Sequence, residues 1–121
     1  MRKLQIVGVF VIGGVLLVSQ SLGGAQPLRM RVTPLMSIAP GNLTVRINLE
    51  SADENRLLRV VAESDDFYRA SEVPLNGASA APVTVFEFRN LPRGNYQISS
   101  ALVGVQGLRA TAWGEAKVHS Y

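Results

Sequence analysis

The sequence predicts an all-β fold in which two antiparallel sheets, with seven short strands in all, pack face to face as a sandwich. Across residues 26–121, apolar and polar residues alternate with period two in segment after segment, and turn-forming residues separate these segments. The 3.6-residue period of an amphipathic helix is missing from this part of the sequence. Alternation of this kind needs an extended backbone that sends successive side chains to opposite faces of a sheet. Seven short strands with turns at this spacing are typical of a two-sheet sandwich.

Residues 1–25 predict a signal peptide. Arg2 and Lys3 give a positive start, and residues 6–18 are an unbroken run of apolar residues and glycine. A retained membrane helix is the alternative. A run of 13 residues, rising about 1.5 Å per residue, covers roughly 20 Å of a hydrocarbon core about 30 Å thick. Cleavage is therefore favoured over retention.

Small residues end the segment, with Ala25 directly before Gln26. Signal peptidase requires small residues at this place, so we expect cleavage between Ala25 and Gln26. The mature chain, residues 26–121, has the size of one sandwich domain that folds without disulfides or metal. We therefore expect a secreted or periplasmic protein with no stable membrane insertion after cleavage.

Six segments of the mature chain alternate clearly, and a seventh, residues 67–73, has mixed faces. The expected strands are residues 28–36, 42–50, 58–63, 67–73, 84–89, 96–103 and 108–118. The second is the clearest, because all its odd positions from Leu43 to Leu49 are apolar. Pro34 marks the first as an edge strand or one with a break. In the last, unbroken counting from Leu108 puts the small apolar residues inward and Trp113 outward.

Residues 86–96 resemble a corner found in immunoglobulin-like modules of the fibronectin type III kind, where a Leu, a Pro-and-Gly turn and a Tyr join the fifth strand to the sixth. The matching residues here are Leu91, Pro92, Gly94 and Tyr96. The resemblance implies that the Tyr96 hydroxyl bonds back to the backbone and that Leu91 closes one end of the core. The same string occurs in transthyretin-like and carboxypeptidase-regulatory-like modules, which are sandwiches too. The tryptophan usual on the second strand of fibronectin modules is absent, and Trp113 lies on the last strand instead.

Composition excludes several chemistries. With no cysteine there is no disulfide, thiol nucleophile, thiolate zinc site or lipid-attachment cysteine. The single imidazole, His119, lies two residues from the C-terminus, which argues against a Ser-His-Asp arrangement or a zinc site. Loss of Arg2 and Lys3 reduces the 12 basic residues to ten against nine acidic ones, so a nucleic-acid partner is not expected. We expect no enzyme activity and no cofactor.

Two acidic arrangements remain to be weighed. Asp53 and Glu54 in one loop and Asp65 and Asp66 in another are oxygen ligands of the kind that calcium prefers, but the sandwich topology separates them by a domain length. Glu63 and Glu115 share an outward face, as a glycosidase-like carboxylate pair would. Solvated turn acids and ordinary surface glutamates are the favoured interpretations.

The outward face of one predicted sheet is the candidate functional surface. In the immunoglobulin-like arrangement the third, sixth and seventh strands share a sheet. Its expected outward residues are Val61, Ala101, Val103 and Trp113, rimmed by Arg59, Gln97, Arg109 and Glu115. A tryptophan among arginines suits contact with a protein or a glycan. The alternatives are that Trp113 packs under neighbouring aliphatic stems or that a bulge at Gly114 turns it inward.

The sequence thus predicts a non-catalytic binding or structural module that acts through this face. One alternative is a transthyretin-like or carboxypeptidase-regulatory-like accessory domain at the cell surface. The other is a small hydrolase that uses surface carboxylates.

Overall fold

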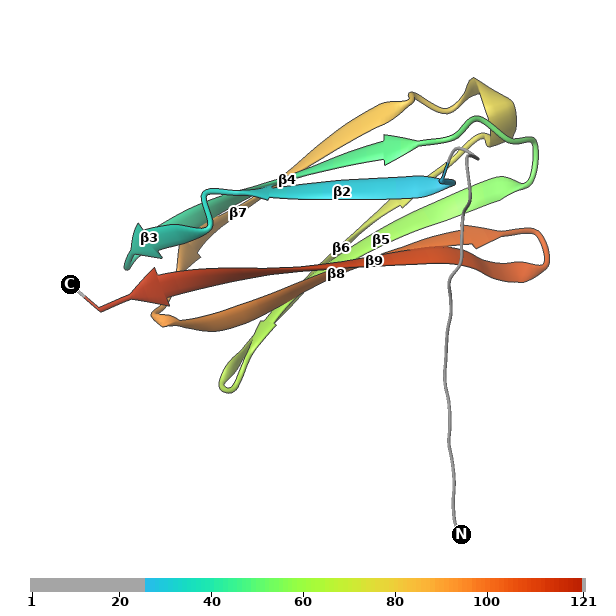
Figure 1. Cartoon of the computed structure of the whole chain (residues 1–121). Coiled ribbons are helices and arrows are strands. Elements are labelled where there is room, and N and C mark those ends of the chain that lie inside the picture. The colour runs from blue at the N-terminus through green and yellow to red at the C-terminus, as the bar shows by residue number, and fades with distance from the viewer. Residues whose placement is uncertain (1–25, 121) are drawn as a thin grey trace, which may run out of the picture.

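A computed structural model describes residues 26–120, and the predicted signal peptide and its Ala25 lie outside them. The described residues form eight strands and one short 3-10 turn, arranged as a two-layer sandwich (Figure 1). The strands are β2 (Leu28–Thr33), β3 (Met36–Ile38), β4 (Gly41–Leu49), β5 (Asn55–Ser64), β6 (Phe67–Pro74), β7 (Val83–Leu91), β8 (Gly94–Gly104) and β9 (Gly107–His119), with the 3-10 turn η2 at Gly77–Ser79.

One sheet has three strands in the order β2-β4-β7, and the other has five in the order β3-β9-β8-β5-β6. All neighbouring strands are antiparallel except β3 and β9, which are parallel. The predicted all-β sandwich is confirmed, and the less regular segment 67–73 is the edge strand β6, paired with β5.

The predicted number of seven strands is wrong because the first expected strand, residues 28–36, is two strands. β2 pairs with β4 in the three-stranded sheet, whereas β3 pairs with β9 in the other sheet. Pro34 lies between them and has no backbone N–H to donate to a ladder. The break that Pro34 indicates therefore lets the N-terminal segment contribute to both layers.

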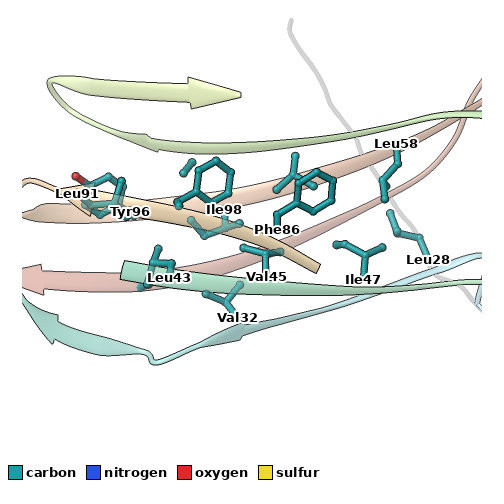
Figure 2. Close-up of a cluster of buried hydrophobic side chains, with 14 of the residues drawn as sticks. Leu28, Val32, Leu43, Val45, Ile47, Leu58, Phe86, Leu91, Tyr96 and Ile98 are labelled. Carbon is teal, nitrogen blue, oxygen red and sulfur yellow. The ribbon is translucent and has the colours of Figure 1, made fainter. Parts of the chain in front are cut away.

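The core lies between the two sheets and follows the alternation of the sequence (Figure 2). Leu43, Val45 and Ile47 on β4 are fully buried, as are Leu58 and Ile98 on the facing sheet. The other buried apolar residues include Phe86 and Phe88 on β7 and Leu102 and Val118 on β8 and β9. Removal of this apolar set from water is the main favourable contribution to the packing of the two sheets.

An apolar corner closes one end of the sandwich, where β7 turns into β8 (Figure 2). The Tyr96 hydroxyl donates a hydrogen bond of 2.6 Å to the backbone oxygen of Pro92, which is the bond that the resemblance implies. Leu91 is fully buried beside it, and Phe67 meets the Tyr96 ring edge-on with 5.9 Å between ring centroids. Gly94 opens β8, where an added Cβ would lie 3.2 Å from the Ser64 side chain. Burial raises the pKa of the Tyr96 hydroxyl above its ordinary value.

A polar cluster closes the opposite end. Arg109 Nη1 donates to the side-chain oxygen of Asn55 at 2.5 Å, and Asn55 in turn donates to the backbone oxygen of Glu50 at 3.0 Å. Asn55 is 1% exposed, and Arg109 also lies 3.3 Å from a carboxylate oxygen of Glu54. These bonds satisfy polar groups that would otherwise be costly to bury.

The expected side-chain directions at the start of the last strand are wrong for two residues. Leu102 pairs with Ala110 while Val103 pairs with Leu108, so Arg109 is an extra residue that forms a β-bulge. Leu108 is consequently 65% exposed rather than inward, and Arg109 folds over the end of the sandwich rather than onto the outer face.

Candidate surface site on the five-stranded sheet

The outer face of the five-stranded sheet carries the candidate site, and strand register fixes its layout. Ser99 on β8 lies between Val61 on β5 and Trp113 on β9. Ala101, one step along, lies between Arg59 and Thr111. Because serine and alanine are short, the middle strand is a low floor between taller side chains on either side.

Trp113 stands at one wall of this floor and is 64% exposed. Its register with Ser99 is continuous through Gly114, which pairs with Ile98, so the bulge considered at Gly114 is absent. Gly114 faces the core, where an added Cβ would lie 3.2 Å from Val32. The indole ring therefore points outward by alternation along the part of β9 that follows the bulge at Arg109.

The opposite wall comes from β5 and β6. Arg59 Nη2 donates a 2.8 Å hydrogen bond to the hydroxyl of Tyr68, and Arg59 Nε lies 3.7 Å from a carboxylate oxygen of Glu72. Tyr68 is itself 56% exposed. The two walls and the floor enclose a shallow groove of about 350 Å³. Its lining residues are Arg59, Val61, Glu63, Tyr68, Gln97, Ser99, Ser100, Ala101, Thr111 and Trp113.

Most of the residues expected on this face lie together on it. Val61, Ala101 and Val103 are partly exposed on the outer side of the sheet, with Arg59 and Trp113 beside them. The rim residues Gln97 and Glu115 pair with each other on the same side. Arg109 is separated from this group, as described above, and Leu108 occupies the outward position opposite Val103.

Sequence reasoning missed Tyr68, which supplies the second aromatic ring of the groove. The signal was present: a two-residue turn at Asp65 and Asp66 pairs Ser64 with Phe67 and so puts Tyr68 opposite Glu63. The mixed pattern of residues 67–73 concealed it. The inner side of this edge strand alternates the core-contacting Phe67 and Val73 with the polar residues Arg69 and Ser71, so no apolar face stands out in the sequence.

The two pairs of loop acids that were weighed as calcium ligands lie far apart. Asp53 and Glu54 precede β5, and Asp65 and Asp66 follow it, so the two pairs lie at opposite ends of a ten-residue strand. Within residues 26–120 no three His, Cys, Asp or Glu side chains gather as a metal-holding group. Nor does this part of the chain contain a helix long and apolar enough to cross a membrane.

Glu63 and Glu115 lie on the same outer face, one on each side of Gln97. Two strand spacings separate their backbones by about 10 Å. Both glutamates are exposed residues, whereas the general acid of a glycosidase is set against an apolar pocket.

No family model matches the chain, and no curated protein matches it either. Several solved structures, however, match the fold of the chain. A superoxide reductase (neelaredoxin) from Ignicoccus hospitalis aligns with a TM-score of 0.58 at 16% identity, over 78% of this chain and 81% of that one. The sulfur carrier protein SoxY from Chlorobium limicola f thiosulfatophilum aligns with a TM-score of 0.53 at 11% identity, over 78% and 81% of the two chains.

A third match is the PmoD soluble domain from Methylocystis sp. ATCC 49242 (Rockwell), with a TM-score of 0.52 at 14% identity over 76% of this chain and 90% of that one. The protein is therefore an immunoglobulin-like β-sandwich. The matching proteins have varied functions, and at these identities the likeness shows the fold alone.

Proposed function

We propose that the protein is a secreted or periplasmic binding module that acts without catalysis through the groove between Trp113 and Tyr68, on a protein or glycan partner. The observation that carries this proposal is that Trp113 is 64% exposed. An indole held in water forgoes the burial that a core position would provide, and tryptophan and tyrosine are the residues most enriched at binding hot spots.

The groove offers a partner both apolar and polar contacts. Trp113 and Tyr68 supply flat rings, and Gln97, Thr111 and Glu63 supply hydrogen-bonding groups around them. The short floor at Ser99 leaves room for a ring or a side chain to lie flat. This combination suits recognition of a saccharide ring or of an exposed peptide side chain.

The residue chemistry favours binding over catalysis. The one histidine of the sequence, His119, is exposed at the far end of β9, away from the groove. A hydrolase acting through Glu63 and Glu115 is the remaining enzymatic alternative. A substrate panel distinguishes the two: activity that disappears in Glu63→Gln or Glu115→Gln would establish the hydrolase, and we expect no activity.

Within the immunoglobulin-like class, we favour the fibronectin type III kind. The Tyr96 bond to Pro92 supports this assignment, as does the pairing of β6 with β5 in the larger sheet. The alternative is a transthyretin-like or carboxypeptidase-regulatory-like accessory domain at the cell surface, which would use the same corner string.

The proposed export is tested by the position of the mature N-terminus. We expect the mature protein to begin at Gln26, and N-terminal sequencing of the protein from its native host checks this directly. Ala25→Leu should slow release, because signal peptidase accepts only small side chains at that position. Recovery of Met1 on a membrane-embedded protein would contradict both the cleavage and the localisation.

Partner binding is tested with two matched variants. Trp113→Ala removes the exposed ring of the groove, and Val85→Ala shortens a residue that is 56% exposed on the other sheet. Wild type and both variants are applied to a glycan array and to crosslinking capture from the native extracellular or periplasmic fraction. We expect the same glycan or protein to be retained by wild type and Val85→Ala and lost with Trp113→Ala. Equal retention by all three would contradict the proposed site.

A further inference from the structure

Three arginines gather on the outer face of the three-stranded sheet, on the opposite side of the molecule from the groove. Arg29 and Arg31 project outward from β2, and Arg46 projects outward from β4. Arg31 lies directly opposite Arg46 in the ladder, and Arg29 lies opposite Asn48. Directly opposed residues have Cβ atoms about 4.5–5.5 Å apart, and like charges in that position destabilise a sheet.

The part of the chain that the structure describes forms no ion pair with these arginines. Glu87 is on the same face, but it already accepts two hydrogen bonds from Arg89, at 2.9 and 2.6 Å. The three guanidinium groups thus form a concentrated positive site in a mature chain whose basic and acidic residues nearly balance.

These arginines line a hollow. It has a volume of about 420 Å³ and is bounded by Arg29, Met30, Arg31, Arg46 and Asn48. A guanidinium presents N–H donors in a planar fork that matches the oxygens of an oxyanion, and the Asn48 amide adds a further donor. A phosphate group has three terminal oxygens and up to two negative charges, so one phosphate can engage three guanidiniums.

We propose that this hollow binds a phosphate group. The bound group neutralises the opposed pair Arg31 and Arg46 and accepts hydrogen bonds from Arg29 and Asn48. The phosphate can come from a soluble phosphate monoester or from the headgroup of an anionic lipid. A lipid phosphodiester keeps two terminal oxygens and one negative charge, which the opposed pair Arg31 and Arg46 can still engage. This site is separate from the Trp113 groove and does not depend on the function proposed for it.

The test is an NMR titration of the folded chain 26–121 with inorganic phosphate, in which chloride keeps the ionic strength constant. We expect saturable shifts of the backbone amides at residues 29–31 and 46–48. In the double variant Arg31→Gln/Arg46→Gln, the dissociation constant should rise about tenfold or more, because hydrogen bonds to charged groups are lost. The matched control is Arg93→Gln, which removes one positive charge from the exposed turn before β8 and should leave the dissociation constant within about twofold.

A second arm identifies the source of the phosphate. Wild type and the double variant are sedimented with phosphatidylglycerol vesicles and with phosphatidylcholine vesicles. If wild type sediments with phosphatidylglycerol vesicles and the double variant does not, the site binds a lipid headgroup. If wild type shows localised shifts with inorganic phosphate but does not sediment with the vesicles, the site binds a soluble phosphate. Identical behaviour of wild type and the double variant in both arms would overturn the proposal.

Discussion

Tyr96 and Trp113 lie on neighbouring strands of one sheet and yet have opposite environments. Tyr96 on β8 is 1% exposed and bonds to the Pro92 backbone, whereas Trp113 on β9 is 64% exposed and faces only Ser99 across the ladder. The pleat decides between them, because alternate residues of a strand point to opposite faces. An aromatic ring on the inner face stabilises the fold, and one on the outer face is available to a partner.

Tyr96 is therefore expected to contribute to stability, and Trp113 to recognition of a partner. Substitutions around Tyr96 should lower the free energy of unfolding, and substitutions around Trp113 should change binding instead. The expected effects on stability decrease from Leu91 through Tyr96 to Trp113.

The largest effect is expected at Leu91. Leu91→Ala leaves a cavity beside Tyr96 and should lower the free energy of unfolding by about 2–5 kcal/mol. Urea denaturation measures it. Leu108→Ala is the matched control, because Leu108 is 65% exposed and its truncation should cost well under about 1 kcal/mol. Equal losses in the two variants would show that the buried corner does not carry the stability assigned to it.

The next effect is at the tyrosine hydroxyl. Tyr96→Phe removes the donor to the Pro92 oxygen and leaves that oxygen without its partner, at a cost of about 1–3 kcal/mol. Tyr68→Phe is the control, since its hydroxyl is on an exposed residue and water can replace the bond to Arg59. An unchanged denaturation midpoint for Tyr96→Phe would refute the corner bond.

Alkaline pH should reduce the stability that the Tyr96 hydroxyl contributes. Burial raises the pKa of Tyr96 above its ordinary value of 10.0, so the unfolded chain ionises this hydroxyl at lower pH than the folded chain. The stability from this group is complete below pH 10.0 and is lost as the pH rises through the folded-state pKa. The difference in the free energy of unfolding between wild type and Tyr96→Phe should therefore narrow as the pH rises above 10.0. A gap that widens would show that the folded state favours the ionised hydroxyl.

The two ends of the sandwich show why one was predictable from the sequence and the other was not. The Tyr96–Pro92 bond joins residues four apart, so a single contiguous string records it. The Arg109–Asn55 bond joins residues 54 apart and needs a bulge on β9. Alternation does not reveal a bulge, because it assumes that each residue has one partner.

The candidate site was likewise predictable in part from the sequence. Counting along β9 places Trp113 outward, and the structure agrees because the bulge at Arg109 and the two-residue turn before it restore the register with Ser99. Arg109 and Leu108 lie before that point and were misplaced. The second ring of the groove, Tyr68, comes from the edge strand β6. Its inner side mixes apolar and polar residues, so hydrophobic patterning does not reveal its direction.

The most direct test of the account is the fluorescence of Trp113, because it is the one tryptophan of the chain. In the folded protein the emission should resemble that of an indole in water and should be quenched readily by acrylamide. Trp113→Ala should lower the free energy of unfolding by well under the 3–5 kcal/mol typical of deleting a core aromatic. Blue-shifted emission that acrylamide does not reach, together with a core-sized loss of stability, would show that the ring is part of the core and that the groove has no aromatic anchor at Trp113.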